Sequence, residues 1–189
     1  RPGIDSTGLF GVTSSTAVIR DVGLEAGAVN GATDTATLVG NNAGTISGSY
    51  SNMSVTGTAN TGGLVGNNSG TVSNSYASGA VTGTNTVGGL VGVNSGALTN
   101  NYATGAVTGS SNTGGLAGAS TGSATGNFWD TVTSGQATSA AGTGLTTTQM
   151  KSPASYTSAA WDQANTWIIY DTYTYPLLRA FMTPLQVNF

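Results

Sequence analysis

Side chains capable of acid–base chemistry are few in this chain of 189 residues, which has seven acidic residues, four basic residues and no histidine. From Thr35 through Trp129 there is no charged residue. A polysaccharide lyase or hydrolase needs paired carboxylates or calcium-binding acids on one face. Asp21 and Glu25, with Arg20 beside them, are the closest acidic pair, and the sequence favours a solvated terminal segment for them.

The remaining acids outside the N-terminal segment are dispersed. Asp130, Asp162 and Asp171 are spread through the C-terminal part and would meet only through folding. The chain has no cysteine for disulfides or thiolate metal sites, and without histidine it lacks the commonest base and metal ligand. We therefore predict no enzymatic activity, no metal site and no cofactor, and keep a polysaccharide-degrading β-helix enzyme as a second alternative.

An array of hydroxyl side chains offers a different kind of surface. Thr-Gly-Thr recurs 26 residues apart and ends as Thr-Gly-Ser, after valines that are predicted to point inward. If the chain coils with this period, the hydroxyls form two outward columns, about 7 Å apart along the strand and ~4.8 Å apart between coils. Such a face resembles those of ice-binding solenoids, although threonine is also ordinary on exposed strands. The candidate binding face consists of Thr56, Thr58, Thr82, Thr84, Thr108 and Ser110.

Two short motifs match the glycosylation sequon. They are Asn52-Met53-Ser54 and Asn67-Asn68-Ser69. Because the motif is short and frequent by chance, we interpret both as incidental.

The threonine array belongs to a repeat that organises the middle of the chain. Three kinds of position recur every 26 residues, and a fixed period of this size indicates a solenoid or a similar array. The leucine position is occupied by Leu38, Leu64, Leu90 and Leu116. The aromatic position is occupied by Tyr50, Tyr76, Tyr102 and Phe128. The valine position is occupied by Val55, Val81 and Val107.

Within one repeat, short apolar or β-branched runs are separated by glycine and asparagine. Each run is too short for a helix, and the glycines oppose helix formation by ~1 kcal/mol apiece. Three short strands and three corners are predicted for each coil, with Val72, Asn74 and Tyr76 on one side of their strand. The predicted fold is all-β: a right-handed parallel β-helix of four to five coils, on the order of 20–25 Å long, with a small C-terminal α/β cap.

Stacking also explains the neutral composition, because a charge at a repeated position would meet its copy at ~5 Å. Neutral side chains avoid this repulsion, and Asn42, Asn68 and Asn94 are predicted to form a hydrogen-bonded amide ladder. The leucine and aromatic positions are both predicted to form columns inside the coils. One recurring corner, predicted to need a positive φ, is marked by Gly44, Gly70, Gly96 and Gly122.

The pattern divides the chain into residues 1–37, a degenerate N-terminal coil, residues 38–141, four repeats, and residues 142–189, a C-terminal capping segment. In the first segment, Gly8-Leu9-Phe10-Gly11 lies three residues too early for the period, and 18–24 is predicted to be a strand. In the last, Thr146 or Thr147 is expected to cap a short helix with Gln149 near the capping-box position. Strands are predicted at 167–170 and 175–181, and this aromatic-rich tail is expected to fold over the last coil.

Residues 62–83 and 88–109 follow the pattern Gly-Gly-Leu-Val-Gly-x-Asn-x-Gly-x-Val/Leu-x-Asn, continued by Tyr-Ala and Val-Thr-Gly. This pattern resembles the GLUG-motif repeat of large bacterial surface and secreted proteins, many of which are similar to filamentous-haemagglutinin-like adhesins. The resemblance extends over roughly residues 8–181. It implies an extracellular β-solenoid, and it transfers no catalytic residue.

The predicted function is therefore structural and adhesive, as a segment of a secreted or surface-anchored bacterial protein. Its Ser/Thr/Asn faces would contact glycan, extracellular matrix or a cell-surface ligand, or the chain would self-associate into fibres. An ice surface is the alternative partner. A net charge of −3 argues against nucleic-acid binding, and no segment is predicted to insert into a membrane.

Overall fold

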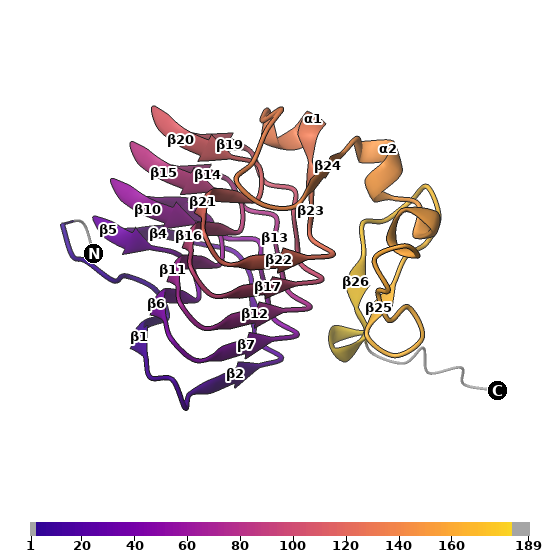
Figure 1. The fold of residues 1–189 in the computed structure, drawn as a ribbon, viewed down its shortest axis with the longest axis horizontal. Coiled ribbons are helices and arrows are strands. Elements are labelled where there is room, and N and C mark those ends of the chain that lie inside the picture. Colours follow the sequence, from indigo (N-terminus) through magenta and orange to yellow (C-terminus); the bar gives the residue numbers. More distant parts are fainter. Residues whose placement is uncertain (1–2, 183–189) are drawn as a thin grey trace.

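The computed structural model describes residues 3–182 and shows a β-solenoid of about five coils (Figure 1). Every strand pair within the coils is parallel, which confirms the predicted parallel β-helix. Each complete coil contributes one short strand to each of five sheets, whereas the sequence predicts three strands per coil. The coil therefore turns at more places than the hydrophobic runs indicate.

The five sheets are numbered here in chain order. Sheet 1 contains β1 (Phe10–Thr13), β6 (Val39–Asn42), β11 (Val65–Asn68), β16 (Val91–Asn94) and β21 (Ala117–Ser120). Sheet 2 contains β2 (Val18–Arg20), β7 (Thr45–Ser47), β12 (Thr71–Ser73), β17 (Ala97–Thr99) and β22 (Ser123–Thr125). Sheet 3 contains β3 (Gly23–Leu24), β8 (Tyr50–Ser51), β13 (Tyr76–Ala77), β18 (Tyr102–Ala103), β23 (Phe128–Asp130) and β24 (Thr143–Leu145). Sheet 4 contains β4 (Ala28–Asn30), β9 (Ser54–Thr56), β14 (Val81–Thr82) and β19 (Val107–Thr108). Sheet 5 contains β5 (Thr33–Thr35), β10 (Ala59–Gly62), β15 (Asn85–Gly88) and β20 (Ser111–Gly114).

The first coil takes up its extra residues at two turns. Phe10 pairs with Val39, 29 positions later, whereas Val18 pairs with Thr45, only 27 positions later. Two of the three extra residues therefore lie in the turn between β1 and β2, and the third lies between β3 and β4. From Ala28, which pairs with Ser54, the 26-residue register holds. The irregular first unit is thus an ordinary coil with longer corners.

A left-handed residue separates sheets 2 and 3 in every coil. In the third coil this residue is Asn74, with a φ of 46°. It reverses the alternation of side chains, so that Val72 and Ser75 are buried in the coil while Tyr76 points outward. The prediction that Val72, Asn74 and Tyr76 share one side of a strand is therefore wrong. The equivalent left-handed residues are Asp21, Gly48, Asn100 and Gly126.

The recurring corner glycines are required for a different reason than predicted. Gly70 and its equivalents are absent from the residues with positive φ among 3–182. A Cβ atom on Gly70 would overlap the carbonyl oxygen of Gly44 in the coil below, and the same clash recurs between Gly96 and Gly70. Close backbone stacking, rather than a left-handed conformation, therefore excludes a side chain at this corner.

The interior of the solenoid combines apolar columns with two ladders of hydrogen bonds. The leucine column is fully buried, as predicted. In the first ladder, Asn42 Nδ2 donates to Asn68 Oδ1 and Asn68 Nδ2 donates to Asn94 Oδ1, both at 2.8 Å, so the predicted amide ladder is confirmed. Thr13 and Ser120 extend it at its two ends, at 2.7 and 3.1 Å. This first ladder links all five coils.

A second buried ladder lies beside sheet 3 and is not predicted. In each coil a buried side-chain oxygen accepts a hydrogen bond from a backbone N–H group of the coil below. The distances are 3.1 Å from Ser49 to Ser75, 2.9 Å from Ser75 to Asn101, and 3.0 Å from Asn101 to Asn127. Two serines are followed here by two asparagines, so the shared role of the position is hidden in the sequence.

The aromatic column stands outside the coils, contrary to the prediction. Tyr76 is stacked between Tyr50 and Tyr102, with ring centroids 4.9 and 4.8 Å away. The next residue in each strand, such as Ala77 after Tyr76, points into the core instead. The rings are covered by the C-terminal segment, which lies along the flank of sheet 3 (Figure 1).

The C-terminal part has two separate roles. Residues 134–145 close the end of the solenoid: Ser139 Oγ accepts hydrogen bonds from the N–H groups of Leu116 and Ala117, and Trp129 fills the end of the core. Residues 146–182 run back along the flank, where Trp161 contacts Phe128 and Phe181 reaches Tyr50. The aromatic tail therefore covers a side of the rod, and the expectation that it folds over the last coil is wrong.

Short elements build this C-terminal part. The helical ones are α1 (Thr131–Ser134), α2 (Thr147–Met150) and the 3₁₀ helices η1 (Pro153–Tyr156) and η2 (Arg179–Phe181). Thr146 and Gln149 form the predicted capping box of α2. The predicted strands at 167–170 and 175–181 shorten to β25 (Trp167–Ile168) and β26 (Leu177–Leu178), which pair antiparallel. Among residues 3–182, no helix is long and apolar enough to cross a bilayer.

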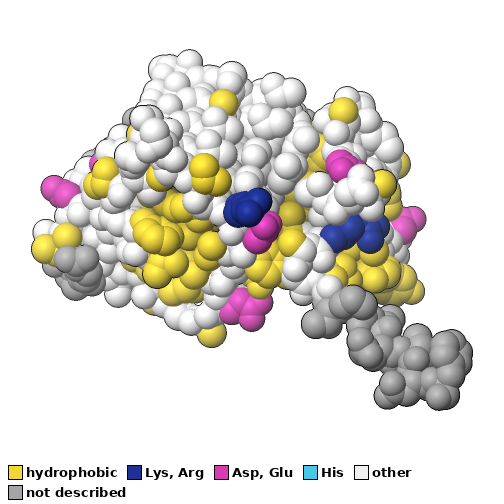
Figure 2. All heavy atoms as spheres, turned by 90° about the horizontal axis from the view of Figure 1, so that it is seen from below, with side chains coloured by type: hydrophobic (Ala, Val, Ile, Leu, Met, Phe, Trp, Pro, Cys, Tyr) yellow, Lys and Arg dark blue, Asp and Glu magenta, His cyan; other side chains and the backbone are white. Residues whose placement is uncertain are grey.

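The N-terminal end of the rod is exposed within the described residues. Strands β1 to β4 each pair on one side only, with the strand of the second coil. Hydrophobic side chains gather on the face seen in Figure 2, which views the rod from this end. In the first coil, the most exposed large hydrophobic side chains are Val12 at 68%, Val18 at 67% and Leu9 at 57%.

Candidate functional site

The predicted hydroxyl array is at the surface. Thr82 pairs with Thr56 and Thr108 in adjacent strands of sheet 4, and all three side chains are exposed. The strands end at these residues, so Thr84 and its equivalents Thr58 and Ser110 lie after a bend, also exposed. The six hydroxyls therefore form two columns on either side of a bend.

Glycine and valine position this array from inside. Val81 and its equivalents are buried beneath the first column in one small cluster, as predicted. Gly83, at the bend, lies against Val87 and Thr61 of the interior, where a Cβ atom would clash. Since Asn30 continues the column of Thr56 into the first coil, the threonine column has three rungs.

The acidic residues do not converge. Asp34 accepts a hydrogen bond from Asn60 at 2.8 Å, and Asp162 accepts the N–H groups of Ala164 and Asn165. These backbone hydrogen bonds, chiefly that of Asn165, lower the pKa of Asp162. Residues 3–182 hold no group of three or more acids that would form a metal site. Each of these two carboxylates is used locally, by a turn or a neighbouring coil.

Asp130 is the one fully buried acid of the described chain, and it anchors the C-terminal part. It caps α1 through the N–H groups of Val132 and Thr133, at 2.8 and 3.1 Å. Its second oxygen accepts Thr147 Oγ1 at 2.8 Å and Tyr175 Oη at 2.7 Å. Burial, together with the hydrogen bond to Asp130, raises the pKa of Tyr175 to about 12. Four donors satisfy this carboxylate, so its geometry fits a structural role.

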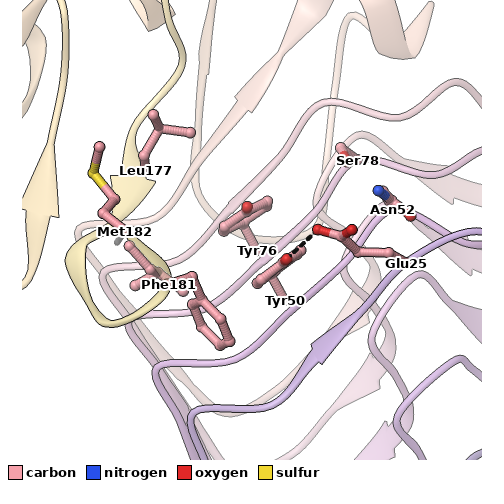
Figure 3. Close-up of a pocket in the computed structure, with 9 residues that line it drawn as sticks. Glu25, Tyr50, Asn52, Tyr76, Ser78, Leu177, Phe181 and Met182 are labelled. Carbon is pink, nitrogen blue, oxygen red and sulfur yellow. Dashed lines mark hydrogen bonds between the residues drawn. The ribbon is translucent and has the colours of Figure 1, made fainter. Parts of the chain in front are cut away.

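A pocket of about 290 Å³ lies between sheet 3 and the flanking segment (Figure 3). Glu25, Asn52 and Ser78 line its solenoid side, beside the rings of Tyr50 and Tyr76. The opposite wall is apolar and comes from Leu177, Leu178, Phe181 and Met182. The pocket thus joins a polar wall from three coils to an apolar wall from the tail.

The tyrosines of this pocket are held by stacking and by one carboxylate. Tyr50 Oη donates a short hydrogen bond to Glu25, and the ring of Phe181 meets Tyr50 edge-on at 4.8 Å between centroids. The hydrogen bond to Glu25, with some burial, raises the pKa of Tyr50 to about 12. Burial raises the pKa of Tyr76 as well. Both phenols therefore keep their protons at neutral pH.

A second hollow of about 480 Å³ lies at the C-terminal end, against Thr125, Phe128 and Thr143. Its lining within the described residues is neutral and combines hydroxyl and small side chains with the apolar Phe128 and Leu145. Of the two sequons, Asn52 is exposed at the first pocket, whereas Asn67 is half-buried on β11.

The first pocket escapes the sequence analysis because its walls come from opposite ends of the chain. Glu25 looks like a solvated acid of a terminal coil, and the aromatic repeat suggests a core column. The pairing of a repeated tyrosine with alanine, as in Tyr76-Ala77, is a signal that a small residue faces the core and the ring faces out.

Comparison with known proteins adds no relative: no family model, no curated protein and no solved structure matches this chain.

Proposed function

We propose that this chain is a rigid structural and adhesive segment of a bacterial protein, located outside the cell or on its surface. The observation that carries this proposal is the first buried ladder, which joins one side chain of every coil from Thr13 to Ser120. The proposed role is non-catalytic and independent of cofactors, nucleic acid and membrane insertion.

Rigidity follows from the hydrogen bonds of this ladder. A buried amide that makes its hydrogen bonds fixes the register of its coil, because slipping would leave the group unpaired at a cost of about 1–3 kcal/mol. Five coils at ~4.8 Å each give a stiff rod on the order of 24 Å long. Such a rod holds its faces in fixed positions, which is what an adhesive surface needs.

The exposed faces supply the adhesive chemistry. The outward positions of sheets 4 and 5 include Thr82, Asn85 and Ser111, which are neutral donors and acceptors at the surface. Neutral hydroxyl and amide groups hydrogen-bond equally well to glycan, matrix protein or another copy of the chain. We place the partner among these three.

Adhesion of coated beads tests the proposal. Beads carrying the folded chain are expected to be retained on glycan-coated, matrix-coated or cell-covered surfaces, and beads carrying the heat-unfolded chain are not. Light scattering of the free chain measures self-association in parallel. Equal retention of both bead types on every surface, without self-association, would overturn the proposed function.

Ice binding is the second candidate, favoured by the register of Thr56, Thr82 and Thr108 on an exposed face. Thermal hysteresis and ice shaping of the wild-type chain are compared with those of Thr82→Tyr. Activity that collapses in the variant, with its circular dichroism spectrum unchanged, would assign the function to the threonine face. Absence of activity at high protein concentration would remove this candidate.

A further inference from the structure

We propose that the pocket between sheet 3 and the flanking segment binds one neutral sugar residue of a glycan, with Glu25, Asn52, Tyr76 and Ser78 as its hydrogen-bonding groups. This inference rests on the proposed adhesive function and assigns it a site and a ligand class. The site lies on a different side of the rod from the threonine array.

The size of the pocket fits a single sugar ring. At about 290 Å³ it lies at the small end of ligand pockets, which range over about 300–1,000 Å³. Leu177 and Phe181 form an apolar wall on the tail side, opposite the polar groups of the coils (Figure 3). A sugar ring has the same division, with apolar C–H groups on its faces and hydroxyls around its rim.

The polar groups of the pocket retain hydrogen-bonding capacity. Asn52 Oδ1 accepts the N–H of Ala26 at 2.9 Å, which leaves its two amide N–H donors directed elsewhere. Glu25 uses one oxygen for Tyr50, and its other oxygen is an acceptor. Within residues 3–182, Tyr76 Oη and Ser78 Oγ make no hydrogen bond in the protein. Donors and acceptors therefore stand side by side, as vicinal hydroxyls require.

The repeat sets the spacing of these groups. Asn52 and Ser78 occupy the same position in adjacent coils, because Ser51 pairs with Ala77. Adjacent strands are ~4.8 Å apart, a separation that the hydroxyls of one pyranose ring can bridge. The amide and the hydroxyl then contact different hydroxyls of the same ring.

The arrangement of the rings favours a neutral ligand over a cation. Cations bind to the faces of aromatic rings, where the quadrupole is negative. The face of Tyr76 is covered by its stacked neighbours, and the free side of Tyr50 lies against Gly23. Ring edges and phenol groups therefore line the pocket, and edges carry positive potential that suits oxygen atoms. The Glu25 carboxylate already accepts a hydrogen bond from Tyr50 Oη, which partly compensates its negative charge.

Two variants test the pocket against a matched control, all in the 189-residue chain. Ser78→Tyr fills the pocket from an exposed position directly after β13, and Glu25→Gln removes the charged acceptor while keeping its shape. Thr99→Tyr is the control, because it adds the same ring to an exposed position of sheet 2, outside both the pocket and the candidate binding face. All three chains are first compared by circular dichroism and thermal melting.

Binding is measured by ligand-observed nuclear magnetic resonance against glucose, galactose, mannose and N-acetylglucosamine, and on an array of neutral oligosaccharides. The wild-type chain and Thr99→Tyr are expected to bind at least one of them within about twofold of each other. Ser78→Tyr is expected to lose binding, and Glu25→Gln to weaken it about tenfold, since a charged hydrogen bond is lost.

The outcomes separate this inference from the proposed function. Sugar binding that survives Ser78→Tyr, or binding of oligolysine but no neutral sugar, would overturn the pocket assignment. Adhesion of wild-type beads without any sugar binding would overturn it too, and the adhesive function would stand. Loss of adhesion in all assays would overturn the proposed function itself.

Discussion

Two repeated columns of this molecule are equally regular in sequence and opposite in environment. The asparagine ladder around Asn68 lies inside the coils, where its partners are copies of itself. The aromatic column around Tyr76 lies outside the coils, where its cover is the non-repeating segment that contains Trp161 and Trp167. Both columns have the same 26-residue spacing.

The difference teaches that a period reports stacking and not burial. Residues stack whenever they occupy the same place in successive coils, whichever side they face. The inner column is buried by the coil itself, so its environment is local to the repeat. The outer column is buried only when a distant segment packs on it. The stability of these columns is therefore expected to depend on different parts of the chain.

The largest effect is expected from removing the outer cover. Trp167→Ala takes a fully buried ring from the contact with Tyr76 and Tyr102, and such truncations cost about 3–5 kcal/mol. Denaturant unfolding measures the loss, and tyrosine accessibility to solvent quenchers reports whether the outer column is exposed.

Val18→Ala is the control for this experiment, because Val18 is a hydrophobic residue of the first coil that is 67% exposed. It is expected to change stability by less than about 1 kcal/mol. Equal losses in the two variants would contradict the view that the flanking segment is essential cover.

A smaller loss is expected from breaking the inner column. Asn68→Ala leaves Asn94 Oδ1 without its donor, whereas Asn42 Nδ2 still donates to the carbonyl oxygen of Gly44. The expected loss is therefore about 1–3 kcal/mol, for one unsatisfied buried group. Asn67→Ala changes the adjacent, half-buried residue and should stay within about 0.5 kcal/mol. Denaturant unfolding of both variants measures the difference. If the ladder did not contribute to stability, the unfolding curves of Asn68→Ala and Asn67→Ala would be similar.

The two kinds of corner can be distinguished by placing asparagine in each. Gly70→Asn forces a side chain against the Gly44 carbonyl oxygen. The free energy of unfolding is expected to fall by about 1–3 kcal/mol or more. Gly48→Asn introduces the residue already present in the same left-handed position at Asn74 and Asn100, so it should be tolerated. Melting temperatures test this, and a tolerated asparagine at position 70 would refute the close-approach explanation.

The smallest effect is expected at alkaline pH, from the outer column. The pKa of Tyr50 is raised to about 12 in the folded chain, so its contribution is complete below the unfolded pKa of about 10 and is lost as the pH rises through 12. Thermal stability should therefore fall above pH 10, and fall less steeply in Tyr50→Phe. Parallel profiles for the two chains would show that Tyr50 does not contribute to the alkaline loss.

Much of the fold could be predicted because the same pattern recurs in several coils. Each short segment alone is compatible with more than one structure, but the recurrence is not. Leu64 and Asn68 recur with their neighbours in register, and only stacking explains such recurrence in an uncharged chain. The capping box of Thr146 and Gln149 is a local hydrogen-bond pattern, so it could be predicted without tertiary information. The exposure of the six hydroxyls follows from alternation after a buried valine.

The errors arise where a backbone angle or a distant segment decides. Asn74 adopts a left-handed conformation, and Tyr76 therefore points outward instead of into the core. Asparagine occurs both in such turns and at the ends of strands, so the residue type alone does not predict this change of side. The pocket requires Glu25 and Phe181, which are 156 positions apart in sequence, to be brought to one face. No periodicity connects them.

The sequence by itself determined the stacking: a 26-residue coil, a neutral surface and an interior ladder of asparagines, because identical positions in a parallel array must tolerate their own copies. Only the tertiary structure decided which columns face outward and where the aromatic tail packs. The physical reason is that stacking is a contact between equivalent residues and is written into the period. Burial of an outer column depends instead on a segment with no repeat, whose position is fixed by packing alone.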